Sequence, residues 1–249
     1  MSHTWHIYGS SERAHLIAAR LGLACVNDVP TIQHVQNAQS SQHIWLLDHQ
    51  AVQALLSLPW TTLPPIMDIS GDWFGRQSAR AEFFAQRGVT YLNCDGVFVA
   101  PGERFGFAFC VGGTVPQHIQ STGLLHALAP WPDAWSHTKS ASGAGFLVLL
   151  IHAFQHIALT FLNTPQSFTP QPADLLQLLI QNTQLDIYYY LLAACSHYLA
   201  LQNEPEDYPK DLARLLKSWL EGNLSIFHAL EQAIAQLPVA ITKTIEPKT

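Results

Sequence analysis

The sequence predicts an α/β N-terminal domain, residues 1–138, followed by an all-α C-terminal domain, residues 139–249. In the first half, short runs rich in β-branched and aromatic residues alternate with helical patterns, which is typical of βαβ units and a mainly parallel sheet. From about residue 143 to residue 200, apolar residues recur at helical spacing with almost no strand signal. The architecture therefore changes near the middle of the chain.

Each expected element follows from its local pattern and from the glycines and prolines around it. Strands are expected at residues 5–9, 44–47, 65–69, 90–94 and 105–111, and helices at 12–21, 50–58, 78–88 and 211–220. The long helical stretches 146–154 and 185–199 carry apolar residues around much of their circumference, which indicates burial on more than one side. A second copy of the chain could supply the additional buried side.

The composition excludes several classes of protein. With 48% hydrophobic and 12% charged residues, the chain is not intrinsically disordered. Its net charge of -6, without a cluster of Lys or Arg, argues against nucleic acid as a partner. The longest apolar runs fall well short of the roughly 20 residues that a membrane span needs, so no membrane association is expected.

Neither the N-terminus nor the cysteines indicate secretion or a metal centre. No basic segment followed by an apolar one opens the chain, so we expect a cytoplasmic protein. The cysteines form no C-x-x-C pair, which predicts reduced core residues and no metal site. The four are Cys25, Cys94, Cys110 and Cys195.

The turn after the first expected strand stands where a dinucleotide-binding turn belongs in an α/β protein. It contains Gly9, Ser10, Ser11, Glu12 and Arg13, followed by alanine, and matches G-x-G-x-x-G poorly. Serine replaces the second glycine, and a glutamate at a helix N-terminus repels a phosphate. These five residues are the candidates for binding NADP or NAD, although an ordinary turn with a serine cap is favoured by the motif alone.

Other polar residues offer weaker signals. His152 and His156 have the helical spacing of a zinc pair but lack the Glu of H-E-x-x-H and a third ligand, so buried or interfacial histidines are the favoured interpretation. Asp68 and Asp72 flank a strand end, where catalysis is conceivable, but turn or cap chemistry explains Asp72 better. No catalytic residue is assigned.

Residues 67–113, MDISGDWFGRQSARAEFFAQRGVTYLNCDGVFVAPGERFGFAFCVGG, resemble 6-phosphogluconate dehydrogenase within the β-hydroxyacid dehydrogenase superfamily. That family reads approximately I-D-G-G-N-S, then A-x-x-G-I-x-F-L-D, S-G-G-x-x-G and a strand closing in G-G. The matching positions are Asp68, Ala85, Gly88, Leu92, Gly102, Gly106, Gly112 and Gly113. The segments APWPDAWSH, 129–137, and SGAG, 142–145, also resemble the family, which implies a Rossmann-type N-terminal domain and a dimerising helical domain.

The resemblance fails at the family's working residues. The acid/base lysine of the long helix corresponds to Leu149 and the asparagine one turn later to Ala153, and neither can move a proton or donate a side-chain hydrogen bond. The S-G-G substrate loop becomes Val97, Phe98 and Val99. The sequence thus indicates a degenerate member of this group, in which an anionic sugar acid would face an apolar wall.

The leading hypothesis is therefore a pseudoenzyme that serves as a binding or assembly module, forming a homodimer through the helical domain or engaging another protein. One alternative is an altered NAD(P)-dependent oxidoreductase, with His152, Asp72 or Asp95 moving the proton of a less charged hydroxyacid-like substrate. The other is a sensor that binds a nucleotide or a metabolite without converting it.

Overall fold

The computed structural model describes residues 4–24, 29–31, 33–34, 43–116, 123–163, 185–202 and 205–235. The chain separates into two compact units. The first comprises Met1–His152 together with Ala200–Asp211, and the second comprises Ala153–Leu199 and Leu212–Thr249. The domain boundary predicted after residue 138 lies at the end of a strand, Ser136–Thr138, and stays a prediction.

The first unit contains a six-stranded sheet whose strands follow one another in chain order. The strands are β1 (Thr4–Tyr8), β2 (His43–Leu47), β3 (Ile66–Asp68), β4 (Tyr91–Val97), β5 (Ala108–Gly112) and β6 (Ser136–Thr138). Strands β1 to β4 are parallel, β5 is antiparallel to β4, and β6 is parallel to β5. The predicted mainly parallel sheet is confirmed. Because β5 and β6 run opposite to β1–β4, their carboxyl ends lie at the opposite edge of the sheet from those of β1–β4.

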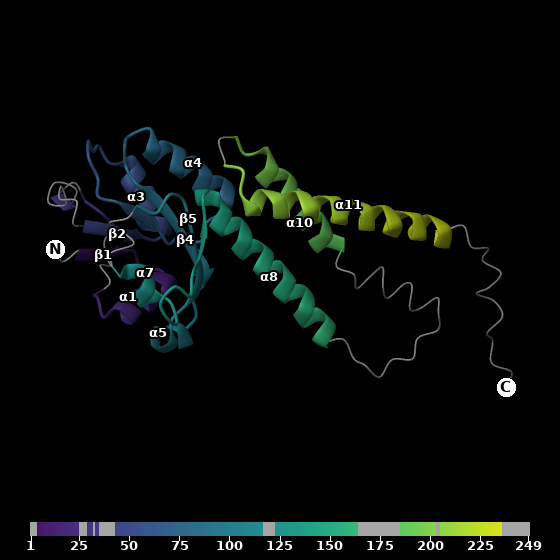
Figure 1. Ribbon diagram of the computed structural model, residues 1–249, viewed down its shortest axis with the longest axis horizontal. Helices are drawn as coiled ribbons and strands as arrows, with labels where there is room; N and C mark the ends of the chain where they lie inside the picture. The colour runs from purple at the N-terminus through teal and green to yellow at the C-terminus, as the bar shows by residue number, and fades with distance from the viewer. Residues whose placement is uncertain are drawn as a thin grey trace. The chain divides into compact units, whose positions relative to one another are not determined.

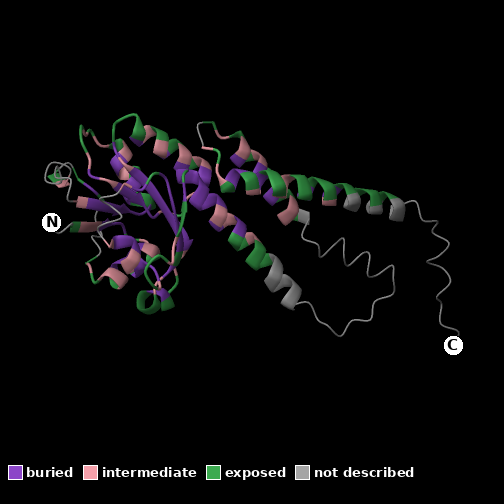
Figure 2. Ribbon diagram, viewed as in Figure 1, coloured by how far each residue is buried: buried purple, intermediate pink, exposed green. Residues whose placement is uncertain are grey.

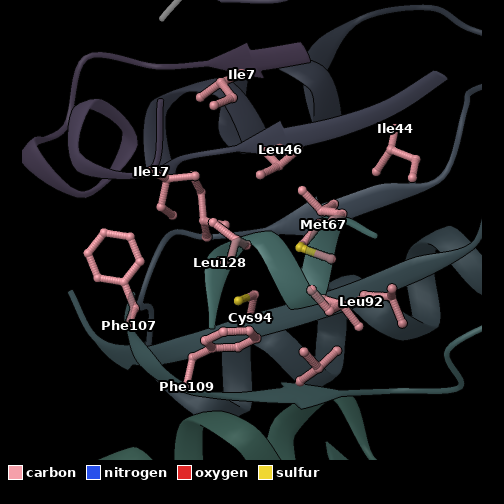
Figure 3. Close-up of a cluster of buried hydrophobic side chains, with 14 of the residues drawn as sticks. Ile7, Ile17, Ile44, Leu46, Met67, Leu92, Cys94, Phe107, Phe109 and Leu128 are labelled. Carbon is pink, nitrogen blue, oxygen red and sulfur yellow. The ribbon is translucent and has the colours of Figure 1, made fainter. Parts of the chain in front are cut away.

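Helices cover both faces of this sheet (Figure 1). One face carries α1 (Glu12–Leu21), α5 (Pro101–Phe105) and α7 (Leu124–Leu128), and the other carries α3 (His49–Ser57) and α4 (Phe74–Ala85). The cluster of buried side chains on the α1 face includes Ile17, Leu46, Cys94 and Phe109 (Figure 3). The strands are accordingly buried between two helical layers (Figure 2), as a parallel sheet requires.

Local sequence explains where α1 and α3 begin and end. Ser11 caps α1 by accepting a hydrogen bond from the Ala14 amide, and Gly22 ends the helix in the left-handed conformation. Asp48 caps α3 in the same way through the Ala51 amide. The predicted bounds of α1 are confirmed residue for residue.

Two predicted elements need correction. The strand expected at 105–111 begins only at Ala108, because Phe105 ends the short helix α5 and Gly106, with a φ of 90°, turns the chain before β5. The helix expected from residue 78 begins at Phe74, whose buried ring packs edge-on against Phe146 at 5.7 Å. Helix α7 and strand β6 were not expected at all.

The helical part contains α8 (Ala141–Asn163), α10 (Leu185–Ala200) and α11 (Tyr208–Ala235). The predicted all-helical character is confirmed for these residues, and α11 is longer than the helix expected at 211–220. Within the second unit, Tyr188 stacks on Trp219 at 5.8 Å, and the Tyr189 hydroxyl lies 2.8 Å from His228 Nε2. None of the described helices combines the length and apolar character of a membrane span.

Candidate functional site

The turn between β1 and α1 has the shape of a nucleotide-binding turn, but its polar groups already have partners. Gly9 has a φ of 133°, and a Cβ at this position would overlap the Asp48 carboxylate. The Ser11 amide donates to Asp48 Oδ2 at 2.9 Å, and the Ser10 hydroxyl donates to Gln50 Oε1 at 3.2 Å. The turn is therefore packed against the start of α3 and hydrogen-bonded to it, and Asp48 is only 1% exposed.

The first turn of α1 keeps limited capacity for an anion. The first amides of a helix lack intrahelical partners. In the part of the chain that the structure describes, the Ser11 amide donates to the Asp48 carboxylate. The Ala14 amide donates to the Ser11 hydroxyl, and the His15 amide donates to the Ser11 carbonyl. The amides of Glu12 and Arg13 are the donors that remain. The exposed Glu12 carboxylate stands beside them and would repel a phosphate.

The side chain of Arg13 extends from this turn across the carboxyl ends of β3 and β4. Its guanidinium donates to Asp95 Oδ1 at 2.9 Å and to the Ile69 carbonyl at 3.4 Å. The guanidinium carbon lies 4.8 Å from the ring centre of Phe98, and Gly71 leaves it room by having no Cβ. Arg13 thus links the candidate cofactor turn to Phe98, within the segment 97–99 that the resemblance aligns with a substrate loop.

Asp95 is held as the buried partner of Arg13. Burial raises the pKa of the Asp95 carboxyl, and the Arg13 charge and the Gly96 amide oppose that rise. The side chain of Asp95 is 6% exposed, against 23% for Arg13. The guanidinium of Arg13 therefore lies between the Asp95 carboxylate, which it pairs with, and the Phe98 ring, which it contacts.

A second ion-pair network lies beside it, centred on Arg80. Arg80 is 4% exposed and donates to Asp68 at 2.7 Å and to Asp72. The Tyr91 hydroxyl also donates to Asp68, at 2.6 Å. Burial and the Asp68 charge both raise the pKa of Tyr91, so its hydroxyl stays protonated as a donor.

His49, which sequence analysis missed, contacts this network from the first turn of α3. Its Nδ1 lies 2.7 Å from Asp72 Oδ2, and its side chain is 47% exposed. Burial works to raise the pKa of Asp72, but the His49 hydrogen bond and the Arg80 charge outweigh it, so the pKa lies below its ordinary value. The sequence did carry a signal. His49 directly follows Asp48 at the end of one strand, and Asp72 follows the next strand, so the fold could bring His49 and Asp72 to the same edge of the sheet.

The remaining candidates are dispersed. His152 and His156 are exposed residues of α8, and the described residues contain no group of three or more metal-binding side chains. Leu149 and Ala153, at the family's catalytic positions, are half-buried on the same helix. Three cysteines, Cys94, Cys110 and Cys195, are buried as predicted, while Cys25 lies outside the described residues.

Comparison with known proteins identifies the fold. No protein-family model matches the sequence, and no curated protein matches it either. A reductive aminase from Aspergillus terreus, in complex with NADPH and ethyl levulinate, aligns over 95% of both chains with a TM-score of 0.52 and 14% identity. An imine reductase variant from Myxococcus stipitatus, in complex with NAD+, aligns over 92% of this chain and 96% of its own, with a TM-score of 0.51 and 14% identity.

At this level of identity the comparison concerns the fold. The alignments extend over nearly the whole of this chain, so the likeness covers both the α/β sheet and the helical region. The fold that the resemblance implies is thereby confirmed. The chain has the fold of these imine reductases, a Rossmann-like α/β sheet followed by a helical region.

Proposed function

We propose that this protein is a binding or assembly module that keeps a dehydrogenase fold without NAD(P)-dependent hydride transfer. The ion pair between Arg13 and Asp95 supports this most directly. It joins the candidate cofactor turn to the segment that the family resemblance places at the substrate loop. Moving Arg13 away to admit a ligand would leave the buried Asp95 charge unpaired, which is costly.

The residues of the cofactor turn fit a dinucleotide poorly. A pyrophosphate needs several amide donors at the helix N-terminus, and here the Ser11 amide is taken by Asp48. Carboxylates of Glu12 and Asp48 flank the two amides that remain. The local charge therefore favours an internal cap over a bound pyrophosphate.

The catalytic positions support the same proposal. Leu149 and Ala153 cannot exchange a proton. Of the groups in the altered-enzyme alternative, Asp95 and Asp72 are paired with arginines, and His152 is exposed on α8. We also keep the cytoplasmic location as a prediction.

An altered oxidoreductase remains the second candidate because of His49. Its Nδ1 is oriented by Asp72, and the described residues offer its Nε2 no partner. A carboxylate-oriented imidazole of this kind can serve as a general base. If this candidate holds, His49→Gln abolishes turnover of a hydroxyacid-like substrate, while the exposed His152→Gln leaves turnover unchanged.

Assembly is proposed to proceed through the helical region as a homodimer. The second unit of the chain exposes several large apolar side chains, which association with another copy could bury. These are Phe154, Tyr189, Tyr190, Leu215 and Trp219, each 45% exposed or more. Sedimentation velocity should give a dimer, and a stable monomer would contradict this part of the proposal.

The deciding experiment is calorimetric titration of the folded protein with NADP+, NADPH, NAD+ and NADH, with and without 6-phosphogluconate. An imine reductase titrated in parallel provides the positive control. We expect no saturable binding up to about 1 mM, a concentration that detects interactions of about 4 kcal/mol. Micromolar binding accompanied by turnover of 6-phosphogluconate or a small 3-hydroxyacid would overturn the proposal.

A further inference from the structure

A cavity lies at the edge of the sheet opposite to the Gly9 turn. Strands β5 and β6 are parallel to each other and antiparallel to β4, so their carboxyl ends lie at the edge where β4 begins. Carboxyl ends of strands are the usual ligand positions in open α/β sheets. A cavity of about 590 Å³ opens here, within the usual size range of small-molecule sites.

Separate segments of the first unit build the walls of this cavity. Helix α4, the start of β4, and the turns that follow β5 and β6 all contribute. Much of the wall is apolar, with Ala81, Val89 and Ala141 among its residues. Thr90 and Thr114 add hydroxyl groups, so the cavity offers an apolar surface with a few hydrogen-bonding positions.

Lys139, in the turn between β6 and α8, places a positive charge on this cavity. Among the lysines and arginines that the structure describes, it alone has no hydrogen bond, ion pair or ring contact within the chain. The others are Arg13, Arg20, Arg76, Arg80, Arg87, Arg104, Lys210, Arg214 and Lys217. In a chain with 12 cationic and 18 acidic residues, an unpaired cation beside a cavity is a distinctive feature.

The charges around the cavity restrict what it can bind. Lys139 supplies one positive charge, whereas Glu82, which accepts a hydrogen bond from Gln86 at 3.3 Å, supplies a negative one. Among the described residues that line the cavity there is no arginine to bind a phosphate with two hydrogen bonds. A single negative charge on a partly apolar molecule suits these walls better than a phosphate dianion does, because Glu82 repels the second charge.

We propose that this cavity binds a small monocarboxylate with an apolar body. The carboxylate pairs with Lys139 and the threonine hydroxyls, and the apolar body lies against Ala81, Val89 and Ala141. This inference deepens the binding role proposed above by naming a ligand class, and it rests on that role. The site lies at the opposite edge of the sheet from the candidate cofactor turn, so the two can be tested separately.

The test is titration of the full chain with sodium hexanoate, with binding measured by calorimetry and by changes in amide chemical shifts. Hexanamide is the matched neutral probe. Lys139→Met removes the charge and keeps the aliphatic stem, and Lys139→Arg restores a charge. Ala85→Trp fills the cavity from an exposed position of α4 and leaves Lys139 in place.

We expect one hexanoate per chain. Hexanamide should bind to the unsubstituted chain, and hexanoate to Lys139→Met, at least about tenfold more weakly, because each change removes a charge-assisted hydrogen bond. Lys139→Arg should retain hexanoate binding, and Ala85→Trp should abolish it. Absence of saturable hexanoate binding, or equal binding by Lys139→Met with an unchanged unfolding midpoint, would overturn the proposal. NADP+ should not compete, so dinucleotide binding would refute the proposed function without affecting this result.

Discussion

The two edges of the sheet use their charges differently. At the carboxyl edge of β1 to β4, Arg13 and Arg80 are paired with buried aspartates of the same chain. At the opposite edge, Lys139 borders a cavity, and its ammonium group has no partner among the described residues. Charges at the first edge therefore stabilise the fold, whereas the charge at the second is available to a ligand.

The largest expected effect comes from a substitution that breaks the Arg80 ion-pair network. Arg80→Met leaves the buried Asp68 without its cation and removes one partner of Asp72, so we expect the free energy of unfolding to fall by about 3–5 kcal/mol. Urea denaturation measures it. Arg76→Met is the matched control, because Arg76 is 66% exposed and 3.5 Å from Asp72, and should cost less than about 1 kcal/mol. Equal effects of the two variants would show that the network does not hold this edge together.

A second substitution tests the contact between the Gly9 turn and α3. Gly9→Ala forces an alanine to a φ of 133° and drives its Cβ into the Asp48 carboxylate, so we expect a loss of about 3 kcal/mol. Gly22→Ala, with a φ of 65° and open space around the new Cβ, should lose only about 1–2 kcal/mol. Thermal unfolding compares them, and a Gly9→Ala variant as stable as Gly22→Ala would contradict the described packing.

Acid should weaken the first edge through Asp72. The pKa of this carboxyl is lowered from its ordinary 3.8 in the folded chain, so its ionised form stabilises the fold above that value, and the stabilisation is lost as the pH falls through the folded pKa. Asp72→Asn should therefore flatten the fall in stability below about pH 4. The exposed Glu103→Gln serves as the control, and chemical denaturation across pH 2–6 is the measurement. An unchanged slope in Asp72→Asn would refute the assigned pairing.

The smallest expected effect is at the second edge. Lys139→Met removes a charge that no described residue uses, so the free energy of unfolding should change by less than about 0.5 kcal/mol. Urea denaturation of this variant beside Arg80→Met gives the sharpest contrast between the two edges. A loss above about 1 kcal/mol would show that Lys139 supports the fold and would remove the basis of the comparison.

Local sequence signals predicted the elements that have a cap or a clear period. Helix α1 was predicted with its observed bounds because Ser11 and Gly22 mark its ends. The start of α4 was missed because no side chain caps it and the packing of Phe74 on Phe146 decides it. Strand β6, only three residues long, depends on its pairing with β5.

The sequence by itself determined the change from α/β to all-α architecture and the leucine at position 149, where the family that the chain resembles has a lysine. Tertiary structure decided the sites, because they join residues far apart in the chain. Ser11 meets Asp48 across 37 residues and Arg13 meets Asp95 across 82. The Lys139 cavity likewise needs α4 and the turns after β5 and β6 together. Periodicity reports how a segment is buried, whereas the partner of a charged side chain depends on which strand ends the fold brings together.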